Sequence, residues 1–61
     1  MKTSIDFKNY LMNKAIPFKI TKMGFFAINV GYLSHIDITK SEYSFTSWQV
    51  DNETLVFRFT N

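Results

Sequence analysis

After Pro17, apolar and polar residues alternate with a period of two through most of the chain, and this pattern limits the fold more than any other feature. Successive side chains of a β-strand point to opposite faces of a sheet, so the alternation predicts strands with one buried face. We expect the strands at about residues 18–22, 25–30, 33–39, 43–50 and 54–60.

The residues before Pro17 repeat at helical spacing instead, with an apolar stripe formed by Phe7, Tyr10, Leu11 and Ala15. Thr3 or Ser4 can cap the start, and Asp6 suits the positive end of a helix. Pro17 disfavours helical geometry at the preceding residue, so we expect a helix over about residues 4–15. The sequence predicts an α+β fold, a single domain over residues 1–61 with one N-terminal helix packed on a four- or five-stranded antiparallel β-sheet.

The sequence is compatible with three connections between the first two strands. A two-residue turn at Met23 and Gly24 would put the apolar residues before and after it on opposite faces. A three-residue loop that starts at Lys22 keeps them on one face, as does one bent strand from Phe18 to Val30.

A polar segment, Asp51-Asn52-Glu53, separates the last two strands and predicts a hairpin. A two-residue loop there pairs even positions of the first strand with odd positions of the second. The expected core face then carries Trp48, Val50, Leu55, Phe57 and Phe59. The opposite face gathers two aromatic rings and a valine beside the single arginine of the chain, namely Tyr43, Phe45, Val56 and Arg58.

We interpret those four residues as a partner-binding surface, because aromatic residues with arginine are typical of protein–protein hot spots. The chain has 61 residues, 46% of them hydrophobic, and no cysteine. A domain of this length buries only about 60% of its unfolded surface, so association is a natural source of further stability. We therefore expect another protein or a second copy as partner, with a homodimer favoured over a monomer.

These features favour a small, non-enzymatic, intracellular protein-binding module. It would inhibit or modulate a larger protein by steric occlusion, as accessory proteins of phages and other mobile elements do. Six lysines against one arginine suit a low-GC bacterial source, and we expect a cytoplasmic location in a bacterial or phage-infected cell. No apolar run approaches the roughly 20 residues of a membrane span, so no membrane partner is expected.

The alternative function is nucleic-acid binding through the helix and first strand. Residues 1–31 hold five lysines and one aspartate, whereas residues 32–61 hold four carboxylates and two basic residues. A basic surface would favour phosphate, with aromatic stacking in support. The candidate residues are Lys8, Lys14, Lys19 and Lys22.

Catalytic chemistry is not expected. Ser34, His35 and Asp37 superficially resemble a triad, but neighbours on a strand project to opposite faces, so Ser34 would point away from His35. One histidine and no cysteine fall short of the nitrogen and sulfur ligands typical of zinc sites. We therefore expect no metal and no cofactor.

Overall fold

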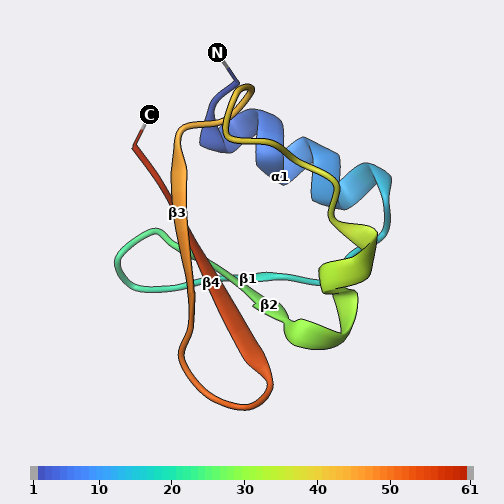
Figure 1. Cartoon of the computed structure of the whole chain (residues 1–61), viewed down its shortest axis with the longest axis vertical. Helices are drawn as coiled ribbons and strands as arrows, with labels where there is room; N and C mark the ends of the chain where they lie inside the picture. The colour runs from blue at the N-terminus through green and yellow to red at the C-terminus, as the bar shows by residue number, and fades with distance from the viewer. Residues whose placement is uncertain (1, 61) are drawn as a thin grey trace.

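The computed structural model describes residues 2–60, which form one α-helix, one 3-10 helix and four strands (Figure 1). Their bounds are α1 (Ser4–Asn13), β1 (Lys19–Ile20), β2 (Phe26–Asn29), η1 (Val30–His35), β3 (Phe45–Gln49) and β4 (Thr54–Phe59). The strands form one antiparallel sheet in the spatial order β1-β2-β4-β3. The predicted α+β fold, with one helix packed on an antiparallel sheet, is confirmed, and of the four or five strands that were predicted the sheet has four.

Helix α1 begins after Thr3, the first of the two predicted caps. The backbone nitrogen and hydroxyl of Thr3 both donate to Oδ2 of Asp6, at 2.8 and 3.2 Å. The helix ends at Asn13, two residues before the predicted end, and a turn over Lys14 and Ala15 leads into Ile16 and Pro17. The helix therefore ends before Pro17, and the chain leaves it at Ala15, where φ is +57°. Pro17 keeps Ile16 out of helical geometry, as expected.

The β1–β2 hairpin has the three-residue loop that starts at Lys22. The backbone nitrogen of Thr21 donates to the carbonyl of Phe25 at 2.8 Å, and Gly24 adopts a positive φ of +84°. This geometry is typical of three-residue hairpin loops with glycine in the left-handed position. The two-residue turn and the single bent strand are both excluded, and the apolar residues of the two strands share one face.

The β3–β4 hairpin also has a three-residue loop, over residues 51–53, and the predicted two-residue loop is wrong. The backbone nitrogen of Val50 donates to the carbonyl of Thr54 at 3.0 Å. Within the loop, Oδ1 of Asp51 accepts a hydrogen bond of 2.8 Å from the backbone nitrogen of Glu53. This local bond favours the longer turn. Odd positions consequently pair with odd ones, as in Ser47 opposite Phe57.

The predicted strand over residues 33–39 is wrong as well. Residues 30–35 form η1, whose start is fixed by the side chain of Asn29, which accepts a 2.7 Å bond from the backbone nitrogen of Gly31. Residues 36–39 are irregular. Ile36 and Ile38 are half-buried and pack against the core from this segment, so their alternation reflects packing and not strand pairing.

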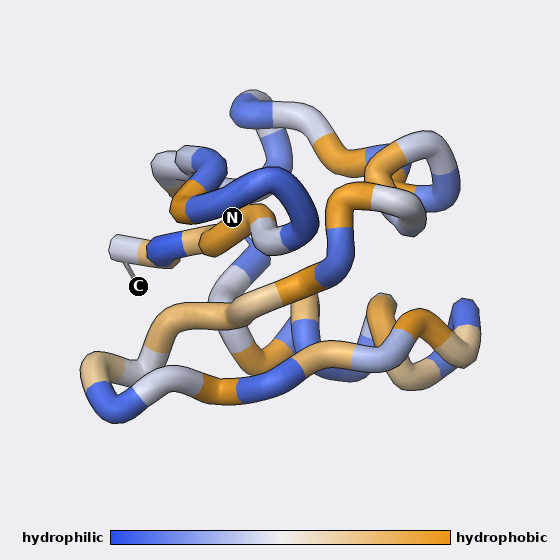
Figure 2. The backbone as a smooth tube through the Cα atoms, turned by 90° about the horizontal axis from the view of Figure 1, so that it is seen from below, coloured by the Kyte–Doolittle hydropathy of each residue, from blue (hydrophilic) through white to orange (hydrophobic). Residues whose placement is uncertain are grey.

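The core lies between α1 and the sheet, with Phe7 at its centre and fully buried. Its ring centroid lies 4.7 to 5.9 Å from those of four other rings, Phe26, Tyr43, Phe57 and Phe59. Along the backbone tube of Figure 2, short hydrophobic stretches are interrupted by hydrophilic ones, as in β2, where Phe26, Ala27 and Ile28 precede Asn29. The side of the sheet that faces α1 is packed, and the other side is not covered by α1.

Candidate functional site

The four predicted partner-binding residues do not share a face. Tyr43 is 2% exposed and belongs to the core, where burial raises the pKa of its hydroxyl. Phe45 is half-buried on the same side, with its ring 5.8 Å from that of Phe57. Val56 and Arg58 lie on the opposite side of the sheet, because the observed register shifts the pairing by one residue.

The side of the sheet away from α1 is formed by residues of all four strands. In the observed registers Lys19 lies opposite Ala27, Ala27 opposite Val56, and Val56 opposite Trp48, which makes one row across the sheet. We call this surface the open face. It comprises Lys19, Phe25, Ala27, Thr46, Trp48, Val50, Thr54, Val56 and Arg58.

The centre of the open face is aromatic. The rings of Phe25 and Trp48 meet edge to face, with centroids 5.6 Å apart and an interplanar angle of 83°. Val56, opposite Trp48 in the register, is only 5% exposed although it is not part of the main core cluster. Trp48 itself is 38% exposed. A large ring is therefore held in place by neighbours and still presents surface to solvent.

Charges are segregated along the open face. Arg58 lies opposite Thr46 on one side of the Trp48 row, the side toward the β1–β2 loop that carries Lys22. The β3–β4 loop, with Asp51 and Glu53, lies at the other end. The backbone N–H of Glu53 holds the pKa of the Asp51 carboxyl below its usual range, because the hydrogen bond favours the charged carboxylate.

The four lysines of the alternative function are distributed over different sides of the molecule. Lys8 belongs to α1, and Lys14 follows the helix, with Nζ 3.4 Å from the carbonyl oxygen of His35. Lys19 lies on the open face, and Lys22 lies in the β1–β2 loop. They do not form one continuous track for a phosphate backbone.

The residues of the superficial triad lie in and just after η1, not on a strand. Ser34, His35 and Asp37 border a pocket of about 540 Å³ together with Lys14, Ala15, Ile16 and Tyr32. The hydrogen bonds found among residues 2–60 do not join their three side chains. Within the same residues no group of three or more histidine, aspartate or glutamate side chains is placed to hold a metal ion.

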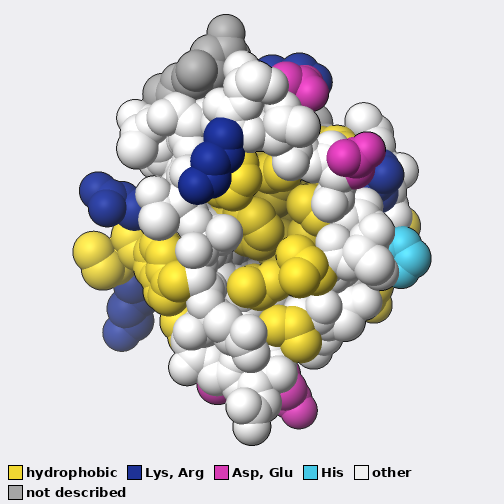
Figure 3. Space-filling model, in the orientation of Figure 1, with side chains coloured by type: hydrophobic (Ala, Val, Ile, Leu, Met, Phe, Trp, Pro, Cys, Tyr) yellow, Lys and Arg dark blue, Asp and Glu magenta, His cyan; other side chains and the backbone are white. Residues whose placement is uncertain are grey.

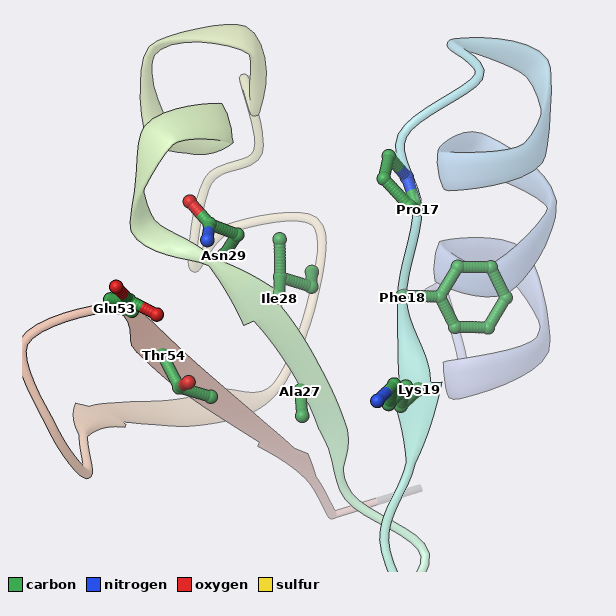
Figure 4. A pocket seen from close by; sticks show the side chains of 8 residues that line it. All are labelled: Pro17, Phe18, Lys19, Ala27, Ile28, Asn29, Glu53 and Thr54. Atoms are coloured by element: carbon green, nitrogen blue, oxygen red, sulfur yellow. The ribbon is translucent and has the colours of Figure 1, made fainter.

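A second pocket, of about 300 Å³, lies where β1 separates from β2 (Figure 4). Pairing of these strands stops at Lys19 opposite Ala27. Two residues further on, Asn29 would pair with Pro17, which has no N–H to donate. The ring of Phe18 points toward α1, while Glu53 and Thr54 lie at the other end of the pocket (Figure 4). The pocket results from the short edge strand, and its lining carries only one cation and one carboxylate.

Another apolar area is visible where the helix does not fully cover the core. Figure 3 shows hydrophobic side chains gathered in the middle of the front face, between the β3–β4 hairpin and the segment that follows η1. Half-buried residues that pack against the core include Ile36, Ile38, Phe45, Leu55 and Phe59. Phe45 and Phe59 are already in contact with other rings of the core. We therefore regard this area as the margin of the core and the open face as the candidate site.

Comparisons with protein-family models, with curated proteins and with solved structures found no match. Among residues 2–60, no helix is both long enough and apolar enough to cross a membrane.

Proposed function

We propose that this protein is a small non-enzymatic binding module whose open face docks on a larger protein and blocks it sterically. The observation that carries the proposal is the Phe25–Trp48 pair, with Trp48 partly exposed on a sheet face that no helix covers. Tryptophan, aromatic neighbours and a nearby arginine such as Arg58 are the residues that dominate protein–protein hot spots.

The charges around the aromatic centre define the partner. Lys19 and Arg58 lie on the open face, and Lys22 lies in the adjoining loop. The matching surface on a partner is an apolar pocket for Trp48 bordered by carboxylates. Such complementary rim charges mainly raise the association rate and exclude wrong partners, whereas the buried aromatic centre supplies affinity.

The setting that we propose is the cytoplasm of a bacterial or phage-infected cell, with the protein as an accessory factor of a phage or another mobile element. The support is its lysine-rich, arginine-poor composition, with six lysines against one arginine.

The test is loss of a specific complex in open-face variants. A protein captured from the host is purified, and its affinity and association rate for wild type, Trp48→Ala, Arg58→Glu and Leu33→Ala are measured by surface plasmon resonance. Leu33 is 51% exposed on η1 and serves as the matched control. We expect Trp48→Ala to weaken binding about 30-fold or more, as for a hot-spot residue. Arg58→Glu should slow association, and Leu33→Ala should bind like wild type.

Unchanged binding by both open-face variants would refute the proposal. Single-stranded nucleic acid is the competing ligand, because exposed aromatic rings beside Arg58 can also stack on bases. A titration with labelled oligonucleotides at two salt concentrations separates the two functions. Binding that persists at moderate salt and is lost in Trp48→Ala would favour the nucleic acid.

A further inference from the structure

Among residues 2–60, no strand pairs with the outer edge of β3, and the isolated bridge between Lys2 and Tyr43 lies before the strand begins. On its inner side, the backbone of Val50 bonds to Thr54 and the carbonyl of Ser44 accepts from Thr60, so even-numbered residues face β4. Hydrogen-bonding direction alternates along an antiparallel strand. The N–H and C=O groups of three residues therefore point outward, those of Phe45, Ser47 and Gln49.

The two edges of the sheet differ in how they are protected. Strand β1 has only two residues, one of which is Lys19, and it follows Pro17. Short length, lysine and proline are the usual means by which proteins prevent pairing at an edge. Strand β3 has five residues, Phe45–Gln49, with no proline, glycine or charge among them. Only the β3 edge has the character of a strand that accepts a neighbour.

We propose that a second copy of this chain pairs with β3 in antiparallel orientation, about a two-fold axis at Ser47. Ser47 then lies opposite its own counterpart, and Phe45 lies opposite Gln49 of the second copy. These three pairs are all of the hydrogen-bonded type, because their backbone groups point outward. The two sheets join into one, and the protected β1 edges lie at its ends, so association stops at the dimer.

The charges at the two ends of β3 complement each other under this symmetry. Near the Phe45 end, three cations outnumber one carboxylate. Lys2 pairs with the carboxylate of Glu42 at 3.0 Å. Nζ of Lys40 lies 5.7 Å from the centre of the Phe45 ring, and Arg58 lies opposite Thr46. Next to the Gln49 end lies the acidic loop of residues 51–53. Antiparallel pairing places the acidic end of each copy beside the basic end of the other, which selects a second copy as the occupant.

The same register brings the two tryptophans together. Trp48 lies opposite Thr46 of the second copy, and its diagonal neighbour is that copy's Trp48, at roughly 7–8 Å between backbone positions. Aromatic side chains reach across such a diagonal. The backbone bonds of the dimer lie at the edge of the sheet, so the dimer does not depend on the proposed docking function.

The experiment is sedimentation velocity over a concentration series, with substitutions at Ser47. Ser47→Pro removes the outward N–H of each copy and leaves the bonds to β4, so we expect dimerisation to weaken about 30-fold for two lost donors. Ser47→Lys places two like charges directly opposite each other and should give a monomer. The control Ser47→Thr keeps the backbone N–H and a small uncharged side chain, and should remain a dimer.

Fluorescence gives a second measurement, because Trp48 is the single tryptophan of the chain. We expect its emission to change with concentration in wild type and in Ser47→Thr, but not in Ser47→Lys. A wild type that sediments as a monomer at all concentrations would overturn the dimer, as would a Ser47→Lys variant that still dimerises. If circular dichroism shows that Ser47→Pro is unfolded, the result for Ser47→Lys alone tests the dimer. A variant that no longer dimerises but still binds the partner would show that the docking function does not require the dimer.

Discussion

Ala15 adopts a left-handed backbone conformation, with φ of +57°, just after the end of α1. Its backbone nitrogen donates to the carbonyl of Met12 at 3.1 Å, and that of Ile16 donates to Leu11 at 2.9 Å. These are the two bonds of a Schellman motif, which usually has glycine at this position. The hydrophobic contact of the motif is present too, since Ile16 and Leu11 are both buried in the core.

At the residue scale we predict that Ala15→Gly stabilises the protein by about 1 kcal/mol, because glycine has no Cβ to clash in this conformation. The melting temperature should rise by about 4–8 °C for a domain of this size. The matched control is Gly24→Ala, where φ is +84° and an added Cβ meets nothing within 4 Å. Gly24→Ala should lose a similar amount of stability, because its backbone conformation alone disfavours a Cβ. Equal melting temperatures for Ala15→Gly and wild type would contradict the prediction.

At the scale of elements, Tyr10 connects α1 to the chain that follows η1. Its hydroxyl accepts a 2.6 Å bond from the backbone nitrogen of Asp37 and lies 3.4 Å from the carbonyl oxygen of His35. This contact joins residues 27 positions apart in the sequence. It holds an irregular segment against the helix, with Ile36 and Ile38 packed on the core.

We predict that Tyr10→Phe destabilises the protein by about 1 kcal/mol, the usual net value of such a hydrogen bond. Amide exchange at Asp37 should become faster, because its donor loses its partner. Tyr32→Phe is the control, since Tyr32 is half-buried on η1 and packs on the same core. Chemical denaturation and hydrogen exchange measure both effects. Unchanged exchange at Asp37 would show that the hydroxyl does not hold the segment.

At the scale of the whole molecule, stability depends on one small cluster of rings. Phe7 is fully buried and contacts rings from β2 and β4 as well as Tyr43. Domains have about 0.05–0.15 kcal/mol of stability per residue, which is only a few kcal/mol for 61 residues. Loss of the central ring therefore removes most of the free energy of unfolding.

We predict that Phe7→Ala abolishes cooperative unfolding, because Phe→Ala substitutions in cores cost about 3–5 kcal/mol. Phe25→Ala, on the open face, should cost roughly 1 kcal/mol and keep the fold. Calorimetry and near-ultraviolet circular dichroism distinguish the two variants. A Phe7→Ala protein that still melts cooperatively near the wild-type temperature would show that the core is not centred on this ring.

Local signals in the sequence were enough to predict the helix and four of the strands. Thr3 with Asp6 starts α1 and Pro17 limits its end, and both effects act over a few residues. The strand over residues 33–39 was predicted from alternation alone, and there the 2.7 Å bond from Gly31 to Asn29 and the packing against α1 favour η1 and an irregular segment. Alternation indicates that one side of a segment is buried, but it does not show whether the segment is a strand.

The candidate site was predicted only in part. Val56 and Arg58 do lie on the side away from α1, but Tyr43 is in the core and Trp48 takes its place as the exposed ring. The signal available in the sequence was the three-residue length of the polar segment from Asp51 to Glu53, which fits the observed loop.

Periodicity and capping are local properties, so the amino-acid sequence is enough to specify a helix followed by strands with one apolar side. Which apolar side is buried depends on packing between distant parts of the chain. A hairpin loop longer by one residue exchanges every side chain of β3 between the two faces relative to β4. The choice follows from packing around Phe7 together with the Asp51 turn, which bury Tyr43 and leave Trp48 at the surface.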